Sequence, residues 1–147
     1  MSLPKKKNLL PVLLLILLAG AGVGYYFYNK GPVNIENAVA QKVEAAGLYQ
    51  AFASDSISAQ QKYSGKILIV SGRLGQTSRN QQGLSIIFLK TGNSGSFINC
   101  TLEQELPSGL KENQLLQIKG ICSGLGQADA ELGIEPDLYL ERCLVQP

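Results

Sequence analysis

The sequence predicts a mainly β protein, a five-stranded OB-fold Greek-key barrel preceded by a transmembrane helix and one or two short helices. The barrel is predicted by five short segments of strand formers that follow residue 63 and are separated by Gly-rich connections. Residues 67–70 are apolar on both side-chain parities, which is typical of a strand shared between two packed sheets. The membrane helix is predicted by an uncharged run at residues 9–28. An SH3-like barrel, which also has five short strands, is the alternative fold.

The uncharged run at residues 9–28 predicts a signal anchor. As a helix rising 1.5 Å per residue it would span about 30 Å, the thickness of the hydrocarbon core of a bilayer. Three lysines at positions 5–7 precede the run and only Lys30 follows closely. The positive-inside rule therefore makes residues 1–8 a cytoplasmic tail and exports the C-terminal domain. We expect a single-pass membrane protein with an exported C-terminal domain.

Two other interpretations of this run stay open. The first is a cleaved signal peptide, with residues 9–18 as its apolar region and the Ala-Gly-Ala at 19–21 as its cleavage site. The second is a buried helix of a soluble protein. A lipidated lipoprotein is excluded because no cysteine lies near the end of the run.

Residues 29–62 are predicted to be a spacer and helical region. Asn34 is a candidate N-cap for a helix. Gly47 weakens the middle of its pattern, so two helical pieces are the alternative to one. The residues that share one face of this helix are Ile35, Val39, Val43 and Ala46. Residues 54–56 then form a break and a second N-cap before a short helix at 57–63. We expect this helical region to pack across the open end of the barrel; a partner-binding face is the alternative.

The OB-fold domain is predicted at residues 63–147. Its strands are expected at 66–73, 84–89, 96–102, 115–122 and 137–145. The connections are expected to be a loop at 75–83, a turn at 91–95, a partly helical connector at 103–113 and a loop at 123–136. Lys119 should face solvent. In the last strand, strict alternation would bury Arg142, so a bulge at Glu141 and Arg142 is expected to return Cys143 to the core.

Composition and charge exclude several classes of function. Setting aside the three lysines at positions 5–7 leaves ten basic against eleven acidic residues, a net charge of −1, which argues against a surface that tracks phosphates. The chain has no histidine, which removes the usual base of Ser-His and Cys-His catalysis. Glu131, Glu135 and Asp137 lack the spacing of a calcium loop, so a solvated acidic loop is expected there. We therefore expect neither an enzyme nor a bound metal or cofactor.

The expected ligand face is the one that OB folds generally use, over the second and third strands and the loops beside them. Its candidate residues are Arg73, Arg79, Lys90, Phe97 and Asn99. Phe97 is the one aromatic residue expected to project outward from this face, which is thin support for stacking of nucleic-acid bases. A protein, peptide or envelope component is therefore the expected partner, and single-stranded nucleic acid is the alternative. The sequence makes no prediction of the oligomeric state.

The three cysteines are Cys100, Cys122 and Cys143, and none forms a CxxC pair. All three are expected to project into the barrel. The fifth strand of an OB barrel runs parallel to the third, which places Cys100 and Cys143 at similar heights. An oxidising compartment therefore favours a disulfide between these two. Another pairing, or three buried thiols that act as small core residues, are the alternatives.

Features spread over almost the whole chain also resemble a known family. They are the lysine-led membrane segment with a Tyr-rich end, Leu48, Phe52 and Asp55, and the motifs at residues 62–66, 70–72, 98–100, 118–124 and 140–143. With these features the chain resembles the tRNA-anticodon-like OB-fold family of small membrane-anchored bacterial proteins, frequent in Bacteroidetes-type genomes. The resemblance implies an OB fold and an exported domain, and it implies no activity. With the predicted anchor, it leads us to expect a single-pass protein of a bacterial inner membrane with a periplasmic domain. The long acidic loop at 128–137 departs from the family pattern.

Overall fold

The computed structural model describes residues 9–29, 31, 33–92 and 95–147, so the expected cytoplasmic tail lies outside the described residues. The chain divides into two compact units, Met1–Asn34 and Ile35–Pro147. The first unit contains helix α1 (Leu9–Asn29), of which no residue is buried. By length and composition α1 is able to cross a membrane, and a signal sequence near an N-terminus meets the same criterion.

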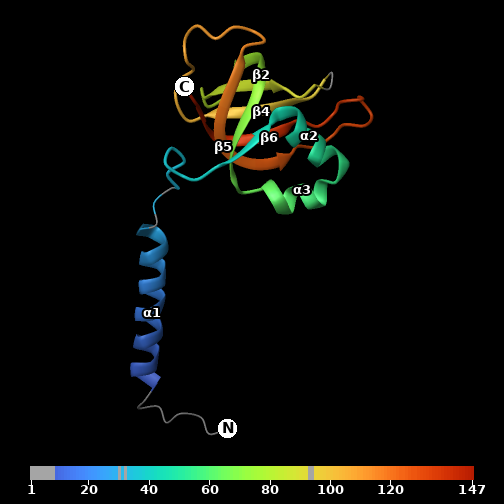
Figure 1. Cartoon of the computed structure of the whole chain (residues 1–147). Coiled ribbons are helices and arrows are strands. Elements are labelled where there is room, and N and C mark those ends of the chain that lie inside the picture. Colours follow the sequence, from blue (N-terminus) through green and yellow to red (C-terminus); the bar gives the residue numbers. More distant parts are fainter. Residues whose placement is uncertain (1–8, 30, 32, 93–94) are drawn as a thin grey trace. The chain divides into compact units, whose positions relative to one another are not determined.

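The second unit contains a closed barrel of five strands (Figure 1). These are β2 (Ile67–Arg79), β3 (Ser85–Lys90), β4 (Phe97–Leu102), β5 (Leu115–Leu125) and β6 (Leu138–Val145). The strand order is β2-β3-β4-β6-β5, and pairing of β2 with β5 closes the barrel. Strand β6 runs parallel to β4 and antiparallel to β5. This is the OB arrangement predicted from the sequence.

A sixth strand, β1 (Gln41–Glu44), replaces the first part of the helix predicted to begin after Asn34. It pairs in parallel with β2, on the stretch Leu68 to Ser71 that also pairs with β5. The helical prediction was wrong because the apolar face it relied on does not form, and Val39 is 97% exposed. Along residues 68–71, β2 pairs with β5 on one side, and β1 supplies hydrogen-bond partners for its backbone groups on the other side. This long-range pairing overrides the local helical pattern.

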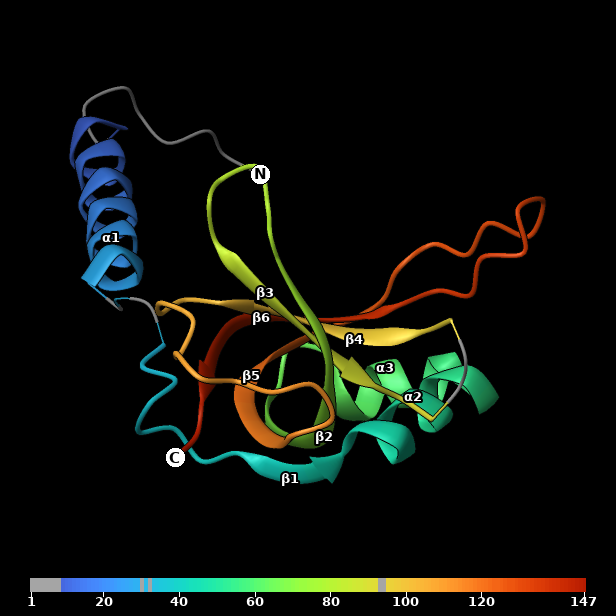
Figure 2. The ribbon, with the colours of Figure 1, turned by 90° about the horizontal axis from the view of Figure 1, so that it is seen from above.

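Two helices, α2 (Ala45–Ser54) and α3 (Ser56–Tyr63), pack against the barrel (Figure 2). Their buried side chains belong to the same apolar cluster as the inward-facing strand residues. The helical members of that cluster are Ala45, Leu48, Tyr49, Phe52, Ala59 and Tyr63. The helices therefore cover the barrel interior, as expected from their apolar faces.

The break between α2 and α3 is set by Asp55, which caps α3 as predicted. Its Oδ1 accepts a hydrogen bond from Ser58 N at 3.1 Å, and its Oδ2 accepts one from Ser58 Oγ at 2.7 Å. The hydrogen bond from the Ser58 hydroxyl and then that from the Ser58 N–H lower the pKa of Asp55. An ionised acceptor at this position suits the positive end of the helix dipole.

The lowered pKa of Asp55 predicts a pH dependence that Asp55→Asn removes, because asparagine also caps helices but does not ionise. A depressed folded-state pKa adds stability above the unfolded-state pKa of about 4, and that stability is lost as pH falls through the folded-state value. The difference in melting temperature between wild type and Asp55→Asn should therefore be constant above pH about 5. At lower pH the wild type should lose melting temperature relative to the variant. Parallel pH profiles for the two proteins would contradict this role of the carboxylate.

The strands depart from the sequence prediction mainly at their ends. Residues 75–79, predicted as loop, continue β2 to Arg79, because a register shift between Leu74 and Gln76 keeps the polar stretch paired with β3. Strand β5 likewise runs to Leu125 instead of ending at residue 122. The connector at 103–113 contains turns and no helix.

The predicted bulge in β6 is confirmed. Arg142 has φ +52°, and the pairing of β6 shifts register at this point against both β4 and β5. Arg142 therefore turns outward and donates hydrogen bonds to both carboxylate oxygens of Glu103. Cys143 returns to the core and is fully buried.

Lys119 on β5 is buried, with 6% of its surface exposed, and does not face solvent as predicted. Its Nζ donates hydrogen bonds to the carbonyl oxygens of Glu36, at 3.0 Å, and Ala38, at 2.6 Å. The side chain points to the outside of the barrel, but the segment before β1 folds over it and buries it. Two charge-assisted hydrogen bonds thus hold this segment against β5.

Candidate ligand-binding face

Strand alternation places one row of side chains on the outside of three adjacent strands. Phe88 on β3 pairs with Asn99 on β4, and Asn99 pairs with Tyr139 on β6. The residues on either side of Asn99 and Tyr139 point into the core, as Ile98 and Leu140 do. We call Phe88, Phe97, Asn99 and Tyr139 the outer face; Phe97 lies two residues before Asn99 on the same side of β4.

The aromatic residues of the outer face lie against bare backbone. The rings of Phe88 and Phe97 meet edge to face, with centroids 5.9 Å apart. A Cβ atom added at Gly75 would lie 2.9 Å from the Phe97 ring, and one added at Gly126 would lie 2.6 Å from the Tyr139 ring. The two glycines therefore make the space that these rings occupy. Tyr139 keeps 42% of its surface exposed.

Asn99 is the polar centre of the outer face and is held by Asp137. The Asp137 carboxylate accepts hydrogen bonds from Phe97 N at 2.8 Å and from Asn99 Nδ2 at 3.1 Å. Because a carboxylate only accepts, it fixes the amide of Asn99 with its nitrogen toward Asp137 and its oxygen away. That oxygen, Oδ1, is buried and has no hydrogen-bond partner, although 8% of the residue is exposed. An unpartnered buried acceptor is unfavourable by about 1–3 kcal/mol, so a donor that reached it would be favoured.

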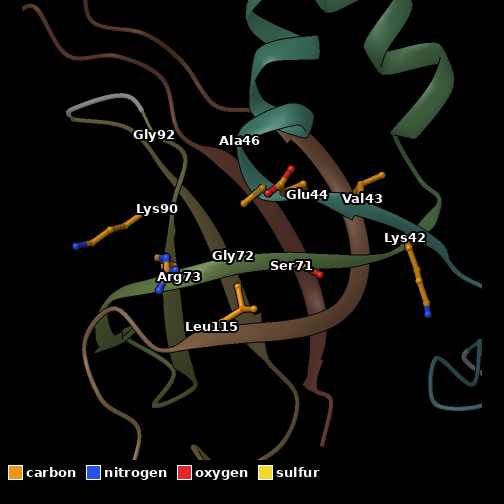
Figure 3. A pocket seen from close by; sticks show the side chains of 11 residues that line it. Lys42, Val43, Glu44, Ala46, Ser71, Gly72, Arg73, Lys90, Gly92 and Leu115 are labelled. Atoms are coloured by element: carbon orange, nitrogen blue, oxygen red, sulfur yellow. The ribbon is translucent and has the colours of Figure 1, made fainter.

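Two of the predicted cations gather at one end of the outer face, where Lys90 pairs with Phe97. Arg73 Nη1 donates to Asn113 O at 3.0 Å, and Lys90 Nζ donates to Asn113 Oδ1 at 2.6 Å. Lys90 also pairs with Glu112 at 3.6 Å. Both side chains border a groove of about 800 Å³ beside β1 and the start of α2. Lys42 lies at the other end of this groove, and its side chain points away from Arg73 and Lys90 (Figure 3). The two cations thus hold the connector before β5.

The sequence-predicted candidates therefore divide into three places. Phe97 and Asn99 lie together on the outer face, and Arg73 and Lys90 lie together at Asn113. Arg79 pairs with Ser85, at the opposite end of β3 from Lys90. It is separate from both pairs.

Two residues of the outer face, Phe88 and Tyr139, and the neighbouring Asp137 were missed from the sequence. Phe88 and Tyr139 follow from the same alternation that identified Phe97, since each lies between inward-facing residues of its strand. Asp137 was assigned to a solvated loop, and this was wrong because the loop returns to β4 and binds Phe97 and Asn99. No local signal indicates that contact, which spans 40 positions in the sequence.

The three cysteines are buried free thiols in this structure. A hydrogen bond with the Cys100 thiol and then burial raise the pKa of Cys143 well above its usual value. Burial raises the pKa of Cys122. Buried neutral thiols of this kind are poor nucleophiles. Among the residues that the structure describes, no three His, Cys, Asp or Glu side chains gather as a metal site.

The proximity of Cys100 and Cys143 leaves the disulfide between them as a prediction. When the domain is exported, a thiol–disulfide oxidant of that compartment would accept the two electrons and two protons that the thiols release. Alkylation of the denatured, unreduced protein should then label Cys122 alone. Cys122→Ala should keep the bond and Cys143→Ala should lose it. Labelling of three thiols in exported protein would contradict the prediction.

Comparison with known proteins gives a family match and similar solved structures. The model of the tRNA_anti-like family matches residues 1–132. A Klebsiella pneumoniae protein named "putative nucleic acid-binding lipoprotein" is similar with a TM-score of 0.54 and 18% identity, over 79% of this chain and 99% of that chain. A "putative aspartyl-tRNA synthetase" from Leishmania major is similar with a TM-score of 0.43 and 7% identity, over 78% of this chain and 22% of that chain. No curated protein matches the chain.

Proposed function

The chain belongs to the tRNA_anti-like family, and from this premise we propose that it is a membrane-tethered, non-enzymatic module that binds a partner on the outer face of its OB barrel. The observation that carries the proposal is Asn99, whose buried Oδ1 lacks a donor in the middle of three aromatic rings. Aromatic surface with one unsatisfied polar group is typical of a binding site. The expected partner is a protein, a peptide or another envelope component.

The proposed location is the periplasmic side of a bacterial inner membrane. Support comes from α1, which is long and apolar enough to span, and from the three lysines at positions 5–7 ahead of it. Reporter fusions test this orientation: a phosphatase fused after residue 34 or after residue 147 should be active, and a cytoplasmic reporter at the same sites should not. The reverse pattern would overturn the proposed location. Retention of α1 in the mature protein separates an anchor from a cleaved signal.

Site-specific crosslinking tests the proposed face. The full chain in its native membranes carries a photo-reactive amino acid in place of Tyr139, and a matched variant carries it in place of Gln117, an exposed residue on β5. Gln117 pairs with Ser71 of β2, so it lies where β2 and β5 close the barrel and not on β3, β4 or β6. A discrete adduct from Tyr139 and none from Gln117 is expected. Equal adducts from both positions, or none from Tyr139, would overturn the assignment of the face.

Single-stranded nucleic acid is the second candidate ligand. Phe88, Phe97 and Tyr139 give the outer face three aromatic rings instead of the one predicted from sequence, and stacking on such rings is how many OB folds hold bases. The name of the Klebsiella pneumoniae protein points the same way. Binding of a dT15 oligonucleotide that weakens steeply with added salt would favour this candidate.

A further inference from the structure

The surroundings of the outer face are acidic. The arm between β5 and β6, residues 126–137, carries four carboxylates and neither lysine nor arginine, and it extends away from the barrel (Figure 2). Asp137 lies at its base, bonded to Asn99. Glu141, two residues beyond Tyr139, is exposed and lines a cavity of about 470 Å³ together with Thr101. Thr101 itself lies two residues beyond Asn99 on β4, so this cavity adjoins the outer face.

Two cations adjoin this surface, and each already has a partner: Lys90 lies opposite Phe97, and Arg142 lines the same cavity as Glu141. Lys90 is hydrogen-bonded to Asn113 and paired with Glu112, and Arg142 is paired with Glu103. A ligand on the outer face would therefore meet one unsatisfied acceptor, several carboxylates and three aromatic rings. Each of these groups favours a cation that carries hydrogen-bond donors, and each disfavours a phosphate.

We propose that the occupant of the outer face is a polypeptide segment that presents an arginine side chain. This inference rests on the proposed function and names the class of its partner. A guanidinium is planar, has five donors and no acceptor, and stacks on aromatic rings. It stacks on the exposed Tyr139 ring and donates to Asn99 Oδ1, and its remaining donors face the carboxylates of Asp137 and Glu141. The acidic arm attracts further basic residues of the same segment.

Lysine satisfies this arrangement less well than arginine. Its ammonium is a compact, strongly hydrated charge without a planar face, so it gains less from Phe88 and Tyr139. Nucleic acid would bring phosphates toward Asp137, Glu141 and the arm, where like charges repel. The preference for arginine therefore separates recognition by this face from general attraction between opposite charges.

The test uses the full chain in detergent micelles and three fluorescein-labelled probes: octa-arginine, octa-lysine and dT15. Fluorescence anisotropy in 150 mM salt should show octa-arginine binding about tenfold more tightly than octa-lysine, and dT15 should not bind. Glu141→Lys and Tyr139→Ser should each weaken octa-arginine binding about fivefold or more. Glu105→Lys, the same charge change at an exposed position of the connector, should leave it unchanged. Glu141 is exposed, so its replacement tests the proposal even if a variant of Asn99 fails to fold.

The outcomes separate the inference from the proposed function. Equal affinity for the two peptides, or equal loss in Glu141→Lys and Glu105→Lys, would overturn the arginine assignment and leave the face standing if Tyr139 still crosslinks. Binding of dT15 that Tyr139→Ser abolishes would also overturn it in favour of nucleic acid. Failure of all three probes overturns the arginine assignment, and absence of a Tyr139 adduct in membranes overturns the proposed function itself.

Discussion

Gly120→Ala is expected to destabilise the barrel by about 3 kcal/mol, at the upper end of the range for overpacked sites. A Cβ atom at Gly120 would lie 2.5 Å from Cys143 Sγ, 3.1 Å from Glu141 O and 3.4 Å from Cys143 Cα. Two of these three atoms belong to the backbone of β6, which cannot move aside as a side chain can. Gly120 has no register partner on β6 because it faces the bulge at Arg142. The glycine therefore permits the close approach of β5 to this bulge.

The matched control for this change is Gly47→Ala. Gly47 lies within α2, and a Cβ atom there would meet nothing within 4 Å. Alanine is favoured over glycine in a helix, so this variant should gain about 0.5–1 kcal/mol. Thermal unfolding of the full chain in detergent, followed by the near-UV circular dichroism of its tyrosines, measures both. If the two variants melt at the same temperature, Gly120 is not needed for a close approach of β5 to the bulge, and this prediction is wrong.

The sequence predicted the barrel because its evidence is local. Alternation of apolar and polar side chains located the five strands, and the need to keep Arg142 out of the core located the bulge in β6. Asp55 was recognisable as a helix cap because its partner, Ser58, lies three residues away. Features whose cause lies far along the chain were not predictable in this way. Strand β1 forms because β2 offers an open edge, and Lys119 is buried because the segment at Glu36 and Ala38 folds over it.

The candidate site shows the same division. Phe97 and Asn99 were found from strand parity, and Phe88 and Tyr139 were within reach of the same argument. The interaction that gives the site its chemistry was not, since Asp137 fixes the orientation of Asn99 only when the arm returns to β4. Arg79 was selected because it is basic, and the pairing with Ser85 places it elsewhere. Selecting residues by charge alone therefore grouped side chains that the strand register places at separate sites.

Phe52→Ala is expected to have the largest effect on stability, a loss of about 3–5 kcal/mol. Phe52 is 1% exposed, and its ring lies with its centroid 6.1 Å from that of Tyr63. Its removal leaves a cavity between α2 and the barrel interior, which the surrounding strands cannot close without losing their register. A domain of this size has a total stability of about 5–15 kcal/mol, so the variant should melt far below the wild type. The same near-UV dichroism measures it.

Ile57→Ala provides the control, because Ile57 lies on the neighbouring helix α3 and is 71% exposed. Its removal should change the unfolding free energy by no more than about 0.5 kcal/mol. The tyrosine signal includes Tyr139 on β6. If Phe52→Ala lowers the melting temperature strongly and Ile57→Ala does not, the helices and the barrel unfold together. Similar melting of both variants would mean that the barrel folds independently of α2, with a boundary near residue 63. The compact unit that begins at Ile35 predicts the first result.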